Sequence, residues 1–191
     1  QNVKNDKVLR LTMLFHDMGK PVMKTTDENG RDHFKGHAIA SEQIAKTVMK
    51  RLKFDNDTIR KVTKLVAYHD YRMEPTGANV RRAMHEIGVE LFPYYLAVRL
   101  ADTKAQSSYE RRGKLENIIQ IRELYRNALR NIECVTLKDL AVTGTDLINL
   151  GIAPGKELGT LLNELLDMVI EDPAWNQKGK LCDYVKERFG F

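Results

Sequence analysis

Residues 9–21 read LRLTMLFHDMGKP, and this segment decides how the first part of the chain folds. Its apolar residues predict a helix that is apolar on most sides and therefore buried. Inside it stand an adjacent histidine and aspartate, His16 and Asp17, although a buried carboxylate is unfavourable unless it is paired or bound to a cation. We expect Gly19 to cap the helix and Pro21 to end it, which would open the last turn toward a cavity.

The apolar spacing is helical along the rest of the chain, with no sustained alternation of period two. The sequence therefore predicts an all-α fold, a helical bundle followed by a smaller helical domain. The stretch GRDH at 30–33 is compatible with a small hairpin, and the connections are rich in Gly, Pro, Asn and Asp. The predicted helices span residues 7–19, 38–53, 57–70, 78–87, 89–106, 113–130, 145–150, 156–170 and 178–189.

The composition is that of a folded domain, with 42% hydrophobic and 30% charged residues in a chain of 191. Cys134 and Cys182 form no closely spaced pair, which argues against a disulfide framework and a structural zinc site and favours a cytoplasmic protein. No apolar run approaches the ~20 residues of a membrane span, and no secretory signal opens the chain. The chain lacks an initial Met, so we expect it to be part of a longer protein.

The net charge of +5 is unevenly distributed. Residues 1–130 hold 25 Lys and Arg against 16 Asp and Glu, whereas residues 131–191 hold 6 against 10. The change of sign places the expected domain boundary near 131–140. A basic first part suits RNA as a partner, although the solvated helix faces of a basic protein have the same composition. By charge, the best candidates for phosphate contacts are Arg111, Arg112, Arg122, Arg126 and Arg130.

A further carboxylate at an apolar position is Asp102, within YYLAVRLADTKAQ at 94–106. It shares a helical stripe with Val98, Ala101 and Ala105, so we expect it to face inward. Two aspartates of this kind in one helical protein indicate a shared cation. A histidine with carboxylates from different helices can hold Mn²⁺, Fe²⁺, Co²⁺, Ni²⁺ or Zn²⁺.

Two more histidines, His37 and His69, stand at the inward positions of predicted helical stripes. Each position fits either a ligand or an ordinary core histidine, and periodicity leaves that choice open. We interpret His33, in a loop with glycines, and His85 as residues outside any site.

The order HD, GH, HD and AD along the chain resembles the HD superfamily of metal-dependent phosphohydrolases. The resemblance implies that His16, Asp17 and Asp102 hold a divalent metal, with Mg²⁺ also among the candidates, and that His37 and His69 can hold a second ion. It also implies a first histidine upstream of the HD pair. This sequence has no histidine before His16, so we expect an incomplete site.

The stretches HDMGKP, HFKGHAIASEQIAKTVMKRLKFDN, LVAYHD and LADTKAQ resemble the HD region of bacterial tRNA CCA-adding enzymes and related poly(A) polymerases. Residues 136–178 are similar to the C-terminal RNA-contacting domain of that family. The resemblance implies an N-terminally incomplete HD domain at 1–130 and an RNA-contacting domain at 131–191. The nucleotidyltransferase head is absent: the one DxD, at 55–57, lies in an interhelical turn where Asp57 is expected to cap the next helix.

The tail contains a glycine-rich turn, LGIAPGKELG at 150–159. Lys156 in the first turn of the following helix is a candidate RNA contact, since free N–H groups and the helix dipole favour phosphate there. A tight turn between packed helices explains the segment equally well. The spacing is not that of a P-loop, and we expect Trp175 to pack a loop onto the core.

For the activity, the resemblance implies hydrolysis of phosphoesters or cyclic phosphates of nucleotides or RNA. Asp17, Asp102 and Lys20 are the catalytic candidates: Asp102 would orient the attacking water, and Lys20, with His37 and His69, would stabilise charge or serve a second metal. The rival interpretation is a non-catalytic RNA-binding body and tail with a vestigial HD site. A nucleotide-sensing regulatory module is a third.

Overall fold

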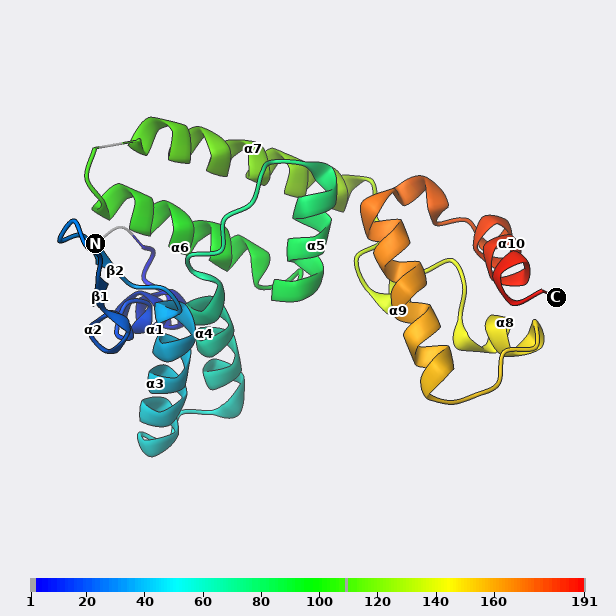
Figure 1. Ribbon diagram of the computed structural model, residues 1–191, viewed down its shortest axis with the longest axis horizontal. Helices are drawn as coiled ribbons and strands as arrows, with labels where there is room; N and C mark the ends of the chain where they lie inside the picture. The colour runs from blue at the N-terminus through cyan, green and yellow to red at the C-terminus, as the bar shows by residue number, and fades with distance from the viewer. Residues whose placement is uncertain (1–2, 109, 191) are drawn as a thin grey trace. The chain divides into compact units, whose positions relative to one another are not determined.

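The computed structural model describes residues 3–108 and 110–190, and most of them are helical (Figure 1). The predicted all-α class is confirmed. In this part of the chain, strands are limited to the antiparallel hairpin of β1 (Thr25–Thr26) and β2 (Asp32–His33), and no helix is long and apolar enough to cross a membrane. The helices are α1 (Lys7–Phe15), α2 (Lys20–Met23), α3 (His37–Arg51), α4 (Asn56–Tyr68), α5 (Gly77–Ile87), α6 (Phe92–Ala105), α7 (Arg111–Arg130), α8 (Gly144–Asn149), α9 (Lys156–Glu171) and α10 (Lys178–Phe189), with 3₁₀ turns at Leu137–Asp139 and Pro173–Trp175.

The chain forms two compact units. One combines Gln1–Met73 with Ile87–Gln120, and the other combines Glu74–Glu86 with Ile121–Phe191. These two units are defined by how the residues pack together and not by their function. The predicted division into an HD domain at 1–130 and an RNA-contacting domain at 131–191 concerns function and stays a prediction.

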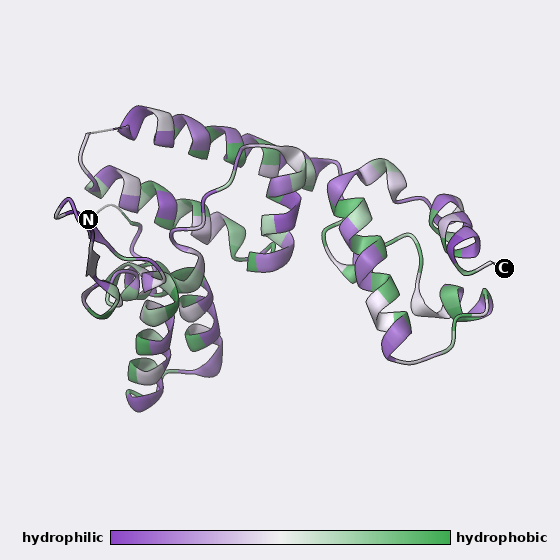
Figure 2. Cartoon of the chain, in the orientation of Figure 1, coloured by the Kyte–Doolittle hydropathy of each residue, from purple (hydrophilic) through white to green (hydrophobic). Residues whose placement is uncertain are grey.

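The first unit is built on α3 and α4, against which α1 packs. Its core consists of one apolar stripe from each helix, and Figure 2 shows hydrophobic and hydrophilic residues alternating along α3 and α4, as in amphipathic helices. Asp55 caps α4 by accepting the N–H of Thr58 at 2.8 Å. The prediction that Asp57 is the cap was wrong: Asp57 lies in the first turn and pairs with Lys61 at 2.6 Å. The buried core residues are Phe15, Ala45, Met49, Ile59, Val62 and Val66.

Two predicted helix bounds need correction. The helix expected at 89–106 begins at Phe92, because Pro93 fits the first turn of a helix. The helix expected at 7–19 ends at Phe15, and Gly19 does not cap it, since its φ of −79° is right-handed. Gly19 serves a close approach instead. A Cβ there would lie 2.4 Å from the carbonyl oxygen of His37, and the Gly19 N–H donates to Ser41 Oγ at 2.8 Å.

The second unit is organised around α9, whose apolar face packs into a core with residues of α8 and α10. Arg81 of α5 is buried beside it. Its guanidinium donates to the carbonyl oxygens of Ile170, at 2.7 Å, and Glu171, at 3.0 Å, and pairs with Glu133 at 2.8 Å. It thereby satisfies carbonyls that the end of α9 leaves without intrahelical partners. The buried core residues are Cys134, Leu140, Val142, Leu147, Ile152, Leu161, Leu165, Leu166, Val169, Ile170, Leu181 and Val185.

A carboxylate fixes the start of α8. Asp146 accepts the N–H and the hydroxyl of Thr143, each at 2.8 Å, in a capping box, and pairs with Lys178 at 2.6 Å. Lys178 and these Thr143 hydrogen bonds lower the pKa of Asp146 to about 2. Because the folded state depresses this pKa, the stabilisation is present above the ordinary pKa of about 4 and is lost as the pH falls toward 2.

Replacing Asp146 by Asn should therefore lower stability in a pH-dependent way. At pH 7 we expect a lower Tm for D146N than for the unaltered protein, and the gap should narrow as the pH falls from 5 to 3. Thermal unfolding followed by circular dichroism at pH 7, 5, 4 and 3 measures the gap. Other carboxylates whose pKa is lowered, such as Asp55, are present in both proteins, so their contributions cancel in the comparison. A gap independent of pH would contradict the assignment.

Candidate metal centre

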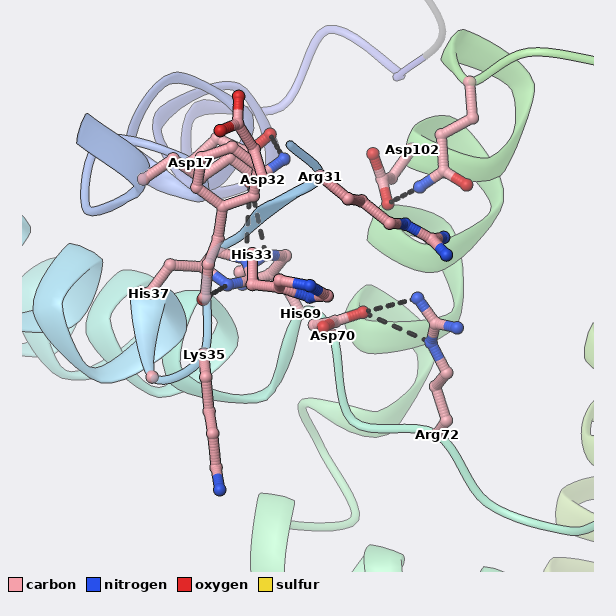
Figure 3. Close-up of a pocket in the computed structure, with 14 residues that line it drawn as sticks. Asp17, Arg31, Asp32, His33, Lys35, His37, His69, Asp70, Arg72 and Asp102 are labelled. Atoms are coloured by element: carbon pink, nitrogen blue, oxygen red, sulfur yellow. Dashed lines mark hydrogen bonds and ion pairs between the residues drawn. The ribbon is translucent and has the colours of Figure 1, made fainter. Parts of the chain in front are cut away.

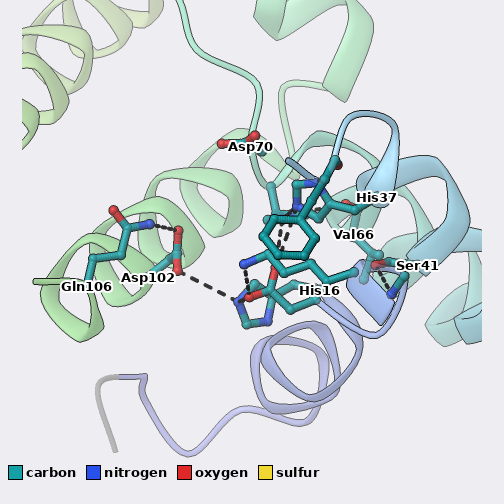
Figure 4. A network of polar contacts seen from close by, with 12 residues as sticks. His16, His37, Ser41, Val66, Asp70, Asp102 and Gln106 are labelled. Carbon is teal, nitrogen blue, oxygen red and sulfur yellow. Dashed lines mark hydrogen bonds and ion pairs between the residues drawn. The ribbon is translucent and has the colours of Figure 1, made fainter. Parts of the chain in front are cut away.

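The conspicuous ionisable residues of the first unit come together where several helices end (Figure 4). His16 follows α1, His37 begins α3, and His69 follows α4. Asp17 lies in the turn between α1 and α2, and Asp102 reaches the same place from α6. All five predicted metal ligands thus meet, although they are spread over 87 positions of sequence, from 16 to 102.

The three histidines share one local arrangement. Each ring donates its Nδ1–H to the carbonyl three residues earlier, at 2.9 Å for His16 and His37 and at 2.7 Å for His69. Since a carbonyl only accepts, Nδ1 carries the proton, and Nε2 of the neutral ring keeps its lone pair. A backbone carbonyl at the distal nitrogen is the usual support for a metal-ligating histidine.

The three Nε2 atoms converge on the carboxylate of Asp17. Its Oδ1 lies 3.6 Å from Nε2 of both His37 and His69, and its Oδ2 lies 3.4 Å from Nε2 of His16. The Nε2 atoms of His37 and His69 are 3.1 Å apart. Two neutral rings would hold lone pairs against each other at that distance, so the arrangement favours a shared cation or an extra proton between them.

Asp17, His37 and His69 form the donor set in the described residues whose atoms all lie within 4.8 Å of one another. His16 and Asp102 adjoin it, with Nε2 of His16 3.7 Å from Oδ1 of Asp102. The sequence placed Asp17 with His16 and Asp102, whereas by distance it also joins His37 and His69. Its two oxygens face the two groups separately.

Two neighbours hold the carboxylates in place. Lys20 Nζ contacts Asp17 Oδ2 at 2.6 Å, so an ammonium lies at this centre. Gln106 donates to Asp102 Oδ2 at 2.7 Å, which leaves Oδ1 for His16. Sequence reasoning missed Gln106, although its position one helical turn after Asp102 was a usable signal.

The surroundings shift the pKa values of His69 and His16 in opposite directions. Burial lowers the pKa of His69, which favours the neutral ring that a metal requires. Burial also opposes charge on His16, but Asp102, Asp17 and the Met13 carbonyl outweigh it and raise the pKa of His16 above its ordinary value. The same His16 imidazole lowers the pKa of Asp102.

A cavity of about 490 Å³ opens from the centre (Figure 3). Its far walls come from the hairpin, the end of α4 and α6, so loop residues with no periodic pattern line it beside the predicted ligands. His33, interpreted as lying outside any site, lines this cavity and pairs with Asp27 at 2.8 Å. His85 instead donates to the Val135 carbonyl at 2.8 Å, as a structural histidine would. The lining residues that the sequence did not indicate are Arg31, Asp32, His33, Phe34, Lys35, Gly36, Arg72 and Gln106.

The predicted RNA contacts lie outside this donor set. Arg112 pairs with Glu116 at 2.9 Å and Arg126 with Glu123 at 2.7 Å, both on the exposed surface of α7. Exposed intrahelical pairs contribute little stability. All five predicted arginines, Arg111, Arg112, Arg122, Arg126 and Arg130, lie on α7, and Lys156 is the exposed first residue of α9.

The glycine-rich turn of the tail has the predicted helix ends. Gly151 follows α8 with a φ of +108°, and Gly155 precedes α9 with a φ of +148°, conformations that favour glycine. Trp175 packs edge-on to Tyr184 with ring centroids 6.2 Å apart, but it stays exposed and is not part of the core onto which it was expected to pack.

Gly19 links the fold to this centre and gives a test. Replacing it by Ala forces α3 away from the α1–α2 turn, because the new Cβ would overlap the backbone of His37 and Ser41. We expect a loss of about 1–3 kcal/mol in the free energy of unfolding, the usual effect of overpacking. Urea unfolding measures it. The matched control is Gly113→Ala in α7, where a Cβ meets nothing within 4 Å; that change should be neutral or stabilising. Equal effects at both positions would contradict the close-approach role.

Comparison with known proteins identifies the family of the chain. Residues 37–185 match the family model described as tRNA nucleotidyltransferase domain 2. The chain belongs to this family. The tRNA nucleotidyltransferase resemblance noted from the sequence is therefore confirmed, while its HD activity stays a prediction.

Within the tRNA nucleotidyltransferase family, a curated relative is the CC-adding tRNA nucleotidyltransferase of Thermus thermophilus. It is 30% identical over 168 residues, which cover 85% of this chain and 36% of the relative. The chain thus spans about a third of the length of that protein. No solved structure matches the chain significantly.

Proposed function

We propose that this chain carries an HD-type, metal-dependent phosphohydrolase centre that acts on phosphoesters or cyclic phosphates of nucleotides or RNA. The observation that supports it most is the convergence of three histidine Nε2 atoms on the carboxylate of Asp17, with each ring held by a backbone carbonyl. The 3.1 Å approach of the His37 and His69 Nε2 atoms favours a shared cation or an extra proton, and imidazoles with carboxylates suit a divalent transition metal.

Asp17, His37 and His69 would hold one metal ion. His16 and Asp102, with the second oxygen of Asp17, offer donors for another. Three imidazoles favour Mn²⁺, Fe²⁺, Co²⁺, Ni²⁺ or Zn²⁺ over Mg²⁺, which prefers oxygen ligands. A bound ion would polarise a phosphoryl oxygen and make water a better nucleophile.

The chain's own side chains have roles that follow from their contacts. Gln106 orients Asp102 through Oδ2, and Oδ1, which faces His16 Nε2 at 3.7 Å, would accept a hydrogen bond from the attacking water once His16 Nε2 binds a metal ion. Lys20, beside Asp17, can neutralise charge that develops on the phosphoryl oxygens. In hydrolysis of a cyclic phosphate, water adds to phosphorus, the bond from phosphorus to one ribose oxygen breaks, and that oxygen takes the proton.

Turnover of adenosine 2′,3′-cyclic phosphate by protein loaded with Mn²⁺, Co²⁺, Ni²⁺ or Zn²⁺ tests the proposal. We expect hydrolysis with at least one metal, and a fall in kcat of about 100-fold or more for Asp102→Asn, as for a lost general base. Asp57→Asn, an exposed aspartate of α4, is the matched control and should keep the rate. The proposal would be overturned if the protein hydrolysed neither cyclic phosphates nor phosphodiesters with any of these metals.

A second candidate function is tRNA binding by a non-catalytic body and tail. Membership of the tRNA nucleotidyltransferase family and the exposed arginines of α7 favour it. Binding of tRNA, measured by fluorescence anisotropy at several salt concentrations, should weaken with salt and with Arg126→Glu. If Asp102→Asn leaves this binding unchanged and no hydrolysis is found, the non-catalytic function is the better account.

A further inference from the structure

The hairpin presents an arginine to the cavity without a carboxylate partner. The acidic residues around Arg31 are engaged by other side chains: Asp27 by His33 at 2.8 Å, and Asp32 by Lys24 at 2.8 Å. Across the described residues, no ion pair or hydrogen bond of the Arg31 guanidinium is found. Among the described residues, Arg31 therefore contributes a cation without an ion-pair partner to the wall of the cavity.

Arg31 is exposed, and its direction differs from that of the lysine that follows the hairpin. In Figure 3 Arg31 extends from the hairpin toward Asp102, on the side of the cavity where Arg72 also lies. Lys35, at the other end of the same hairpin, also lines the cavity, but its side chain points away from Asp102 and the histidines. A cation close to the hairpin in sequence therefore need not point toward Asp102, and Lys35 can be compared with Arg31 as a control.

The charge of the cavity indicates how much negative charge a ligand must bring. Four Lys or Arg side chains and four Asp side chains line it, so its formal charge is zero with neutral histidines. One divalent cation would raise this charge to +2. Lys20 and such a cation already lie where the hydrolysed phosphate would sit, beside Asp17. Arg31, on the Asp102 side, is then left for a second anionic group.

We propose that Arg31 binds a second phosphate of the substrate, separate from the one that is hydrolysed. The proposal rests on the proposed phosphohydrolase function and narrows its substrate class. The preferred substrate carries a terminal cyclic phosphate or phosphoester and another phosphate on the 5′ side of the same nucleoside. An RNA end and a free 5′-phosphorylated nucleotide share that chemistry. A guanidinium suits the role because it presents paired N–H donors to two phosphate oxygens.

The test compares kcat/KM for adenosine 2′,3′-cyclic phosphate with kcat/KM for the same compound carrying a 5′-phosphate, and for a trinucleotide that ends in the cyclic phosphate. We expect the substrates with the extra phosphate to be favoured by about 10-fold to 100-fold, as for charge-assisted hydrogen bonds. In Arg31→Ala the ratio should fall to about one. In Lys35→Ala it should stay at the original value. A higher kcat/KM for the trinucleotide than for the 5′-phosphorylated nucleotide would identify RNA ends as the source, and the reverse order would identify free nucleotides.

A ratio unchanged by Arg31→Ala would overturn the inference even if both rates fell together, because the loss would then concern the hydrolysed phosphate. If the unaltered protein hydrolyses none of these compounds, the proposed function fails, and calorimetric binding then tests whether Arg31 binds the second phosphate of a nucleotide. Adenosine 3′,5′-bisphosphate should bind about tenfold more tightly than adenosine 3′-phosphate, and Arg31→Ala should remove the difference. Equal affinities in the unaltered protein would refute it.

Discussion

Asp17→Asn is expected to abolish stoichiometric binding of a divalent transition metal. Its carboxylate is the group that all three histidine Nε2 atoms face, at 3.4 to 3.6 Å, so an amide there removes the charge that both groups of donors share. We expect the affinity to fall by at least about 100-fold, beyond the effect of losing a supporting residue. Elemental analysis after metal loading and dialysis gives the stoichiometry, and titration calorimetry gives Kd.

The sequence supplies a matched control for this experiment. Asp70 follows His69 as Asp17 follows His16, but Asp70 is outside the donor set and pairs with Arg72 at 3.1 Å. Asp70→Asn should therefore keep the metal. Retention of the metal in Asp17→Asn, or equal loss in both variants, would show that the five residues do not form the centre described above.

Arg81→Met is expected to give the largest loss of stability, about 3–5 kcal/mol, in the transition of the second unit. The side chain is 9% exposed, and its removal strands the Glu133 carboxylate, which is 18% exposed, together with two carbonyls at the end of α9. Urea unfolding followed by circular dichroism measures the change. Metal binding should be unaffected, since the contacts of Arg81 lie in the other unit.

The neighbouring Arg82 is the control for Arg81. It pairs with the Glu171 side chain at 3.0 Å but is exposed, so Arg82→Met should alter stability by about 1 kcal/mol or less. Combining Arg81→Met with Glu133→Leu should recover part of the loss, because no buried charge is then left unpaired. If the two single variants behave alike, the buried network does not have the role assigned to it.

Local signals predicted most of the helices. α3 and α4 form within two residues of the predicted bounds, because their apolar stripes and flanking polar residues are properties of the segment itself. The end of α1 was misplaced because glycine has two uses that look the same in sequence. Gly19 permits contact with α3, and nothing near it in the chain indicates which helix will approach.

The sequence indicated which residues belong to the candidate site, but it did not indicate which of them lie closest together. Buried charge and the HD pairs identified all five ligand candidates, but periodicity cannot tell that Asp17 divides its two oxygens between His16 and the pair of His37 and His69. The cavity walls were out of reach for a different reason. Arg31 reaches the cavity through a hairpin whose strands have two residues each, too short for any pattern.

The carbonyls that hold the three histidines have a consequence for folding as well as for ligation. Each is part of the last turn of a helix or of the turn that leads into one, so the ring geometry exists only while that turn is intact. Fraying of the end of α1 or α4 would release a ring and weaken metal affinity. By thermodynamic linkage a bound ion would hold those ends closed. Metal binding would thus stabilise these helix ends against local unfolding. Amide hydrogen exchange at the ends of α1 and α4, with and without metal, measures that stabilisation.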